Sequence, residues 1–276
     1  MQLAKLCELA YNHELRDDDV IFLADAWFPG LEMLSYIRDG LGLKFKIMGC
    51  LHAGSYDPYD FLAKKGMEYW AESIENGWFK ILDKIFVATN FHKQFVCSKR
   101  KIDHKKVIVT GFPIYDEQKH DIKKENIMVF PHRLDSEKNP QLFDYLEQQI
   151  HLRYPRLLWK FVKTKDVTKT KQEYYDLLKK SKIAISYANQ ETWGIAMQEA
   201  LFARCIPIVP NRLSYSELYD PLFKYGRGTT EESISLVVKA MTQRDLFIDA
   251  LERNRKVLLE KGSKAIGNMI SEIVSC

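Results

Sequence analysis

The chain has 276 residues, of which 46% are hydrophobic and 28% are charged. This composition is normal for a soluble globular protein, and the length fits one large domain or two of ordinary size. The net charge of +4 is compatible with a phosphate-bearing ligand or a nucleic acid but points to neither. No apolar run reaches the roughly 18 to 20 residues that a membrane span needs, and no signal peptide is visible.

The five cysteines are scattered along the sequence, with no CxxC pair and no cysteine-histidine cluster. This pattern argues against a structural zinc site. Four of them lie in or beside apolar stretches, where buried free thiols are the simplest interpretation. A reducing cytosol fits this usage, so we expect a cytoplasmic protein, in the host cytoplasm if the protein is viral. The five are Cys7, Cys50, Cys97, Cys205 and Cys276.

Apolar runs alternate with helical patterns through the first part of the chain. The predicted strands are 20–24, 45–51, 85–88 and 106–110, and the predicted helices are 1–15, 29–42 and 60–83, with another helix after the third strand. This alternation favours an α/β domain with a parallel sheet.

A polar, charged stretch, EQKHDIKKEN at 117–126, predicts a linker between two domains. The alternation then restarts, with predicted strands near 126–130 and at 156–164, 183–187 and 205–211, and predicted helices before 150, at 171–181, at 192–204 and from 214 to the end. We therefore predict two α/β domains, 1–118 and 119–276.

Ligands of open parallel sheets bind beyond the carboxyl ends of the strands. The residues just past each predicted strand are therefore the first candidates for a site. They are Asp25, His52, Gly54, Thr89, Gly111, His132, Arg133, Lys163, Asn189 and Glu191.

The stretch VFPHRLDSEKNP places Arg133 and Lys138 in one loop between a strand and a helix. Two cations there could hold a diphosphate, the arginine through its fork of donors and the lysine as a point charge. The alternative is a solvated loop with two ordinary charges.

The stretch NQETWGIAMQEALFARCIPIVPN carries Glu191 and Glu199 eight residues apart. We expect Glu191 at or just before a helix start, where the amides of residues 192–194 would be unsatisfied donors. Glu199 would then lie two turns on, roughly on the same side of that helix, so that both carboxylates could bind sugar hydroxyls. The alternative is a capping glutamate followed by a solvent-facing one, but a carboxylate in so apolar a helix is costly unless it is paired.

This stretch resembles the retaining nucleotide-sugar glycosyltransferases of family four. Their signature is a glutamate, seven residues and a second glutamate, with an aromatic-glycine pair between them, which Glu191, Glu199 and Trp193-Gly194 match. HRLDSEKNP is similar to the arginine and lysine loop of that family. HAGSYD, with His52, resembles a loop of its first domain, and VATNFHKQFV and VIVTGFPIY resemble further segments.

The resemblance implies an α/β protein of the GT-B fold, with two Rossmann-like parallel-sheet domains facing a cleft. Three features depart from the family. His132 stands where the family usually has glycine, Asn139 stands where glycine often follows the lysine, and the usual first strand with its glycine-rich loop is missing. The first domain is therefore expected to be shortened, by truncation or as in a reduced viral enzyme.

The resemblance also implies roles. Arg133 and Lys138 would neutralise the donor diphosphate and the leaving group, Glu191 would bind donor sugar hydroxyls, and His52 would contact the sugar or the acceptor. Glu199 would hold the ribose. The implied donor substrate is a UDP-sugar or a GDP-sugar. In this class the leaving phosphate takes the acceptor proton, so no dedicated protein base, cofactor or essential metal is expected. The other candidates on the donor side are Thr192, Trp193, Gly194, His132, Lys163 and Gly111, and those on the acceptor side are Asp25, Trp27, Gly54 and Tyr56.

The acceptor stays open. Phage enzymes of this type add sugars to hydroxymethylated pyrimidines in DNA, so we expect such a base as one candidate, with tRNA bases and small metabolites as others. A flipped base could stack on Trp27, Phe28 or Tyr56. The basic clusters at 98–106 and 163–171 are expected to be solvated faces, with contact to the phosphate backbone as the alternative. The alternative to an enzyme is an inactive nucleotide-binding or nucleic-acid-binding module of the same fold.

Overall fold

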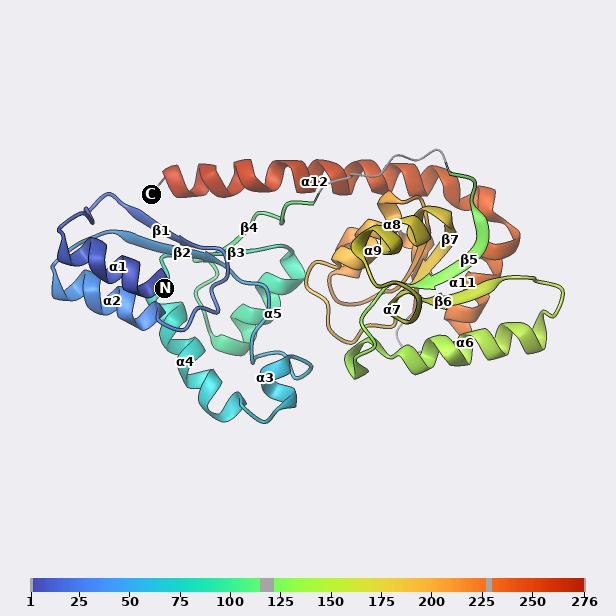
Figure 1. Ribbon diagram of the computed structural model, residues 1–276, viewed down its shortest axis with the longest axis horizontal. Coiled ribbons are helices and arrows are strands. Elements are labelled where there is room, and N and C mark those ends of the chain that lie inside the picture. Colours follow the sequence, from blue (N-terminus) through green and yellow to red (C-terminus); the bar gives the residue numbers. More distant parts are fainter. Residues whose placement is uncertain (1, 115–121, 227–229, 276) are drawn as a thin grey trace. The chain divides into compact units, whose positions relative to one another are not determined.

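The computed structural model describes residues 2–114, 122–226 and 230–275 (Figure 1). The chain divides into two compact units. Unit 1 comprises Met1–Phe112 with Ala265–Cys276, and unit 2 comprises Pro113–Lys264. The predicted boundary at 118/119 lies outside the described residues. The first half of the predicted linker at 117–126 does too, and its last two residues belong to the first strand of unit 2.

Unit 1 is built on a parallel sheet of four strands in the order β1-β2-β3-β4. The strands are β1 (Val20–Leu23), β2 (Lys46–Cys50), β3 (Lys84–Val87) and β4 (Val107–Val109). The helices are α1 (Gln2–Tyr11), α2 (Leu31–Gly40), α3 (Phe61–Lys64), α4 (Glu68–Ile81) and α5 (Asn90–Arg100). The four predicted strands of this half are confirmed, and their apolar side chains form the core with α2, α4 and α5.

The helix predicted over 60–83 is interrupted. The chain forms α3 and α4 instead, separated by Gly66 at a φ of 66°, a left-handed conformation that favours glycine. The buried face of α4 includes Glu75 as well as Trp78.

The last helix, α12 (Ile248–Val274), contributes its final turns to unit 1. Met269 Sδ lies 3.6 Å from the buried Cys50 Sγ, and Lys84 Nζ lies 2.7 Å from a carboxylate oxygen of Glu272. The pattern of the sequence gives no sign of this return, because long-range packing leaves no local signature.

Unit 2 is built on a parallel sheet of five strands in the order β6-β5-β7-β8-β9. The strands are β5 (Glu125–Phe130), β6 (Lys160–Lys163), β7 (Ser181–Ile185), β8 (Ile206–Pro210) and β9 (Lys224–Tyr225). The helices are η1 (Ser136–Lys138), α6 (Pro140–Arg153), α7 (Thr164–Val167), α8 (Lys171–Lys180), α9 (Ile195–Phe202), α10 (Tyr215–Leu218), η2 (Pro221–Phe223), α11 (Thr230–Thr242) and η3 (Arg244–Phe247), before α12. The short strand β9 lies in a region that the sequence predicted as helix.

The order of these strands reverses at β5. The chain passes from β5 to β6 on one side and then returns to β7 on the other side, whereas the described strands of unit 1 follow one another without reversal. Ligands of doubly wound sheets bind where the order reverses, beyond the carboxyl ends of the two strands. The topology therefore directs attention to the loops after β5 and β7.

The strands that flank this point are fully buried. Ile183, Ala184 and Ile185 of β7 and Ile206 and Ile208 of β8 have no exposed surface, as expected for a parallel sheet covered on both faces. Among the described residues, no helix is long and apolar enough to cross a membrane.

Candidate functional site

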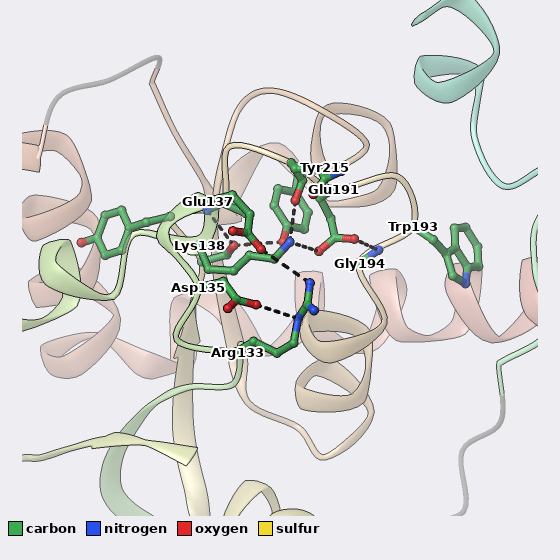
Figure 2. A network of polar contacts seen from close by, with 12 residues as sticks. Arg133, Asp135, Glu137, Lys138, Glu191, Trp193, Gly194 and Tyr215 are labelled. Atoms are coloured by element: carbon green, nitrogen blue, oxygen red, sulfur yellow. Dashed lines mark hydrogen bonds and ion pairs between the residues drawn. The ribbon is translucent and has the colours of Figure 1, made fainter. Parts of the chain in front are cut away.

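The parallel pairing of β5 with β7 brings two candidate loops together. Val129 is in register with Ala184, so the chain leaves both strands at the same edge of the sheet. The loop after β5 carries Arg133 and Lys138, and the loop after β7 carries Glu191 (Figure 2).

Lys138 bridges the two loops. Its side chain is only 10% exposed, and its ammonium donates a 2.6 Å hydrogen bond to the carbonyl of Gln190. The same nitrogen lies 3.4 Å from Glu191 Oε2. A nearly buried cation held against the opposite loop is a fixed positive charge at the edge of the sheet.

Arg133 is held more loosely. Its side chain is 68% exposed, with Nε 3.3 Å from Asp135 and one terminal nitrogen 3.5 Å from the buried Glu137 (Figure 2). An exposed arginine with long ion pairs can turn toward a ligand at small cost. The loop thus offers one fixed cation and one adjustable cation, which suits a diphosphate.

The loop between β5 and α6 turns at Asn139, whose φ of 53° lies in the left-handed region. Asparagine adopts this conformation more readily than most residues, and its side chain also donates a 2.8 Å bond to Tyr187 O. The departure from the glycine of the resembled family is therefore a conservative one. Pro140 then begins α6.

The expected helix start after β7 needs a correction. The helix α9 begins at Ile195, so Thr192, Trp193 and Gly194 precede it, and Gly194 has a φ of 75°. The Gly194 amide is not a spare donor, because it gives a 2.9 Å hydrogen bond to Glu191 Oε1. Glu191 thus uses one oxygen to hold its own loop and the other to face Lys138.

The space around position 194 also favours glycine. A Cβ there would lie 3.1 Å from the ring of Tyr215 and 3.5 Å from Glu191 Cγ, on a backbone that side chains rarely adopt. Tyr215 is fully buried and its hydroxyl lies 2.9 Å from Ser186 Oγ. Burial, and then the Glu191 carboxylate, raise the pKa of this phenol.

Glu199 lies on α9, but the argument that placed it on the same helix face as Glu191 is wrong, because Glu191 is not part of that helix. Its carboxylate is 13% exposed and fully engaged by α8. Lys171 Nζ lies at 2.6 Å, and the hydroxyls of Tyr175 and Tyr174 donate bonds of 3.0 and 2.9 Å. The pairing that an apolar helix demands of its carboxylate is therefore present.

The remaining donor-side candidates of unit 2 differ in setting. Trp193 is buried, and its side chain points away from Lys138 and Arg133 (Figure 2). Lys163 ends β6 and is paired with Asp144 at 2.6 Å. The backbone of Asn189 donates a 2.7 Å bond to Glu137 O, which joins the two loops a second time.

His132 is buried beside Arg133, where the resembled family usually has glycine. Its ring centroid lies 5.2 Å from that of Phe130, and its Nε2 has no hydrogen-bond partner in the structure as described. Burial, and then the charge of Lys138, lower the pKa of His132 from 6.5 to about 3. This histidine is therefore neutral at physiological pH.

In unit 1, the candidates lie in the loops after β1 and β2. His52 is exposed, and its Nε2 donates a 3.0 Å hydrogen bond to Ala24 O, since a carbonyl can only accept. Asp25 is exposed and accepts a bond from the Trp27 amide, while the half-buried Trp27 bonds to Glu75 through its indole.

Tyr56 and Thr89 have core positions. Tyr56 is 4% exposed, with its hydroxyl 2.6 Å from His92 Nε2, so the expectation that it stacks on a base gives way to packing inside the unit. Thr89 caps α5 by accepting from the His92 amide. Gly111, with a φ of 74°, is a buried turn after β4.

Three residues near the β5–β7 point were not predicted from the sequence. Glu137 and Tyr215 are described above. Arg212, two residues beyond β8, donates to Ala188 O at 2.9 Å and to Asn189 Oδ1 at 2.7 Å. The rule that selected residues just past each strand could have found Arg212, because it directly follows the predicted strand 205–211.

Solved structures with this arrangement identify the fold. HepE of Anabaena, in complex with UDP, has a TM-score of 0.72 at 11% identity over 99% of this chain and 81% of that chain. An α,α-trehalose-phosphate synthase (UDP-forming) of Burkholderia vietnamiensis has a TM-score of 0.71 at 12% identity, covering 99% and 79%. Both have the GT-B fold. This chain has the GT-B fold. The predicted fold class is thereby confirmed.

Two further comparisons bear on coverage. TarM has a TM-score of 0.67 at 12% identity over 96% of this chain, which spans 57% of TarM. A tRNA-queuosine alpha-mannosyltransferase of Drosophila melanogaster is 31% identical over 154 residues, which are 46% of this chain and 41% of that protein. The chain thus spans less than two thirds of the length of each of these two proteins. No protein-family model matches it.

The buried His132 predicts a pH dependence of stability. Because its folded pKa is about 3 and its unfolded pKa is 6.5, its contribution is fully present above pH 6.5 and is lost as the pH falls toward 3. From this group alone we expect unfolding to need about 2 kcal/mol less at pH 5 than at pH 8. Urea unfolding at both pH values should show a smaller difference for His132→Phe than for wild type. The exposed His151 provides the control as His151→Gln, and equal differences for wild type and His132→Phe would contradict the prediction.

Proposed function

We propose that this chain is a retaining glycosyltransferase that transfers a sugar from a UDP-sugar or GDP-sugar to a hydroxyl acceptor. The observation that carries the proposal is the meeting of Arg133, Lys138 and Glu191 at the β5–β7 reversal of the strand order. HepE and the pneumococcal O-GlcNAc transferase GtfA are described in complex with UDP, which supports a nucleotide-sugar donor for a chain of this fold.

In the proposed reaction, the bond from the sugar C1 to the diphosphate oxygen breaks and a bond from C1 to the acceptor oxygen forms. The acceptor proton passes to the leaving phosphate. Lys138 and Arg133 would stabilise the negative charge that grows on the departing diphosphate. Glu191, oriented by the Gly194 amide, would accept hydrogen bonds from the sugar hydroxyls. None of these steps calls on a cofactor or metal.

Retention of the anomeric configuration also draws support from a relative. The Drosophila protein is named an alpha-mannosyltransferase, and an α product is what retention yields from an α-linked donor. For the ribose we propose Glu199, which would exchange the tyrosine hydroxyls or Lys171 for sugar hydroxyls.

For the acceptor we propose a modified base of a nucleic acid, with tRNA as the first candidate because the relative is named for tRNA-queuosine. A hydroxymethylated pyrimidine in DNA is the second candidate and can be compared in the same assay. The mild positive charge of the chain suits either polymer.

The basic cluster at 98–106 needs revision as a set of phosphate contacts. Arg100 is only 6% exposed and paired with Glu75, and Lys106 donates to carbonyls at the end of α4. Lys99 and Lys101, in contrast, are exposed. A variant that tests this cluster for phosphate contacts should therefore change Lys99 and Lys101 and keep Arg100.

Calorimetric titration with UDP and GDP tests the donor site. Arg133→Ala and Lys138→Ala should each lose about 1.5 to 3 kcal/mol of binding free energy, the range of hydrogen bonds to charged groups. Arg153→Ala is the control, since Arg153 is paired with Glu231 on the surface of the same unit. Wild-type affinity for both nucleotides in both site variants would remove the diphosphate assignment.

Sugar transfer tests the activity and the acceptor. The chain is incubated with GDP-mannose or UDP-glucose and either queuosine-containing tRNA or duplex DNA with 5-hydroxymethylpyrimidine, and the nucleosides are analysed by mass spectrometry. We expect the wild type to add one sugar to tRNA and Arg133→Ala to add none. The double variant Lys99→Ala/Lys101→Ala should bind tRNA more weakly, and its binding should depend less steeply on salt. Transfer to DNA alone would replace tRNA as the acceptor. Nucleotide binding with neither transfer nor donor hydrolysis would favour an inactive binding module.

A further inference from the structure

Every candidate of unit 1 that lies beyond β1 or β2 belongs to one of two loops. The loop after β1 holds Asp25 and Trp27, and the loop after β2 holds His52, Gly54 and Tyr56. Both loops contact one side chain, that of Glu75 on α4.

Glu75 has no exposed surface, and both of its carboxylate oxygens are occupied. Oε1 accepts from the indole of Trp27 at 2.9 Å and from the backbone amide of Ser55 at 2.5 Å. Oε2 accepts from the Ser55 hydroxyl at 2.8 Å and from Arg100 Nε at 2.9 Å. One buried carboxylate therefore fastens the loop after β1 to the loop after β2.

Arg100 completes the arrangement from the end of α5. Its side chain is 6% exposed, it donates a second bond of 2.9 Å to Ser55 Oγ, and its guanidinium lies 5.8 Å from the centre of the Tyr56 ring. A buried ion pair gives little net stability, because desolvation offsets the attraction between the charges. What this pair does supply is directed hydrogen bonds to the loops.

The packing around Glu75 is tight. A Cβ at Gly54 would lie 2.5 Å from the ring of Tyr56 and 2.7 Å from Glu75 Oε1. No larger residue fits there unless the carboxylate or the ring moves. Gly54 therefore allows the loop to lie directly on the Glu75 carboxylate.

A second ion pair in unit 1 offers a comparison. Arg38 and Asp83 lie 3.2 Å apart, and Asp83 accepts from the Ile47 amide near the amino end of β2. This pair supports the sheet at the end opposite to the two loops. The Glu75–Arg100 pair contacts the carboxyl-end loops instead, where ligands of parallel sheets bind.

We infer that Glu75 and Arg100 are positioning residues that set the geometry of the loops carrying His52 and Trp27. The inference rests on the proposed function for its kinetic consequence, and on hydrogen bonds within unit 1 for its structural one. Loss of the Glu75 charge would release Ser55 and Trp27 together, so that His52 would no longer hold a single position.

The test uses three variants and one control. Glu75→Gln keeps the shape and removes the charge, Arg100→Lys keeps the charge and removes the fork, and Gly54→Ala displaces the carboxylate from the loop side. The control, Arg38→Met, breaks the ion pair at the other end of the sheet. Hydrogen exchange of segments 25–28 and 51–57 is measured in the whole chain, with β3 as the internal reference for folding.

We expect faster exchange in both segments for Glu75→Gln and Gly54→Ala, a smaller change for Arg100→Lys, and none for Arg38→Met. For Glu75→Gln and Gly54→Ala, kcat of sugar transfer to tRNA should fall about a hundredfold, the effect of a displacement near 1 Å. UDP affinity should stay at the wild-type value, because the donor residues lie in unit 2.

Unchanged exchange in the two segments for Glu75→Gln and Gly54→Ala would overturn the inference. So would equal losses of transfer in these variants and in Arg38→Met, since that result indicates general destabilisation. If the wild type transfers no sugar, the proposed function fails separately, and the exchange measurement still decides whether Glu75 positions the loops.

Discussion

The parallel pairing of β5 with β7 is the constraint on which the candidate donor site depends. It reverses the order of the strands and places two loops, distant in the sequence, at one edge of the sheet. The loops are then joined by three polar contacts: the Lys138 ammonium on Gln190 O, the Asn139 amide on Tyr187 O, and the Asn189 amide on Glu137 O. These contacts between the two loops fix the positions of Arg133 and Glu191.

The cations at this edge are paired with carboxylates before any ligand binds. Lys138 faces Glu191, and Arg133 faces Asp135 and Glu137. For the nearly buried Lys138 and Glu137, this pairing avoids the large cost of an unpaired buried ion. A diphosphate would take over the exposed Arg133 with little disturbance, whereas Lys138 is fixed in advance, which is the preorganisation that electrostatic catalysis requires.

Much of this arrangement could be predicted from the sequence. Apolar runs predicted the main strands, and the rule that ligands lie beyond strand ends selected Arg133 and Glu191. What could not be predicted depends on the conformation of single residues or on long-range contacts. The start of α9 at Ile195 follows from the positive φ of Gly194. The burial of Arg100 follows from a partner on another helix, so the run of basic residues did not reveal that one of its members is buried.

The most direct test of the account is a crystal structure of the chain with a nucleoside diphosphate, UDP or GDP. The account predicts density for the diphosphate at the carboxyl ends of β5 and β7, within hydrogen-bonding distance of Lys138 Nζ and the Arg133 guanidinium. Arg133 is expected to leave Asp135 when the nucleotide is bound. Density for the nucleotide at another place, with Arg133 and Lys138 still paired as they are in Figure 2, would contradict the account.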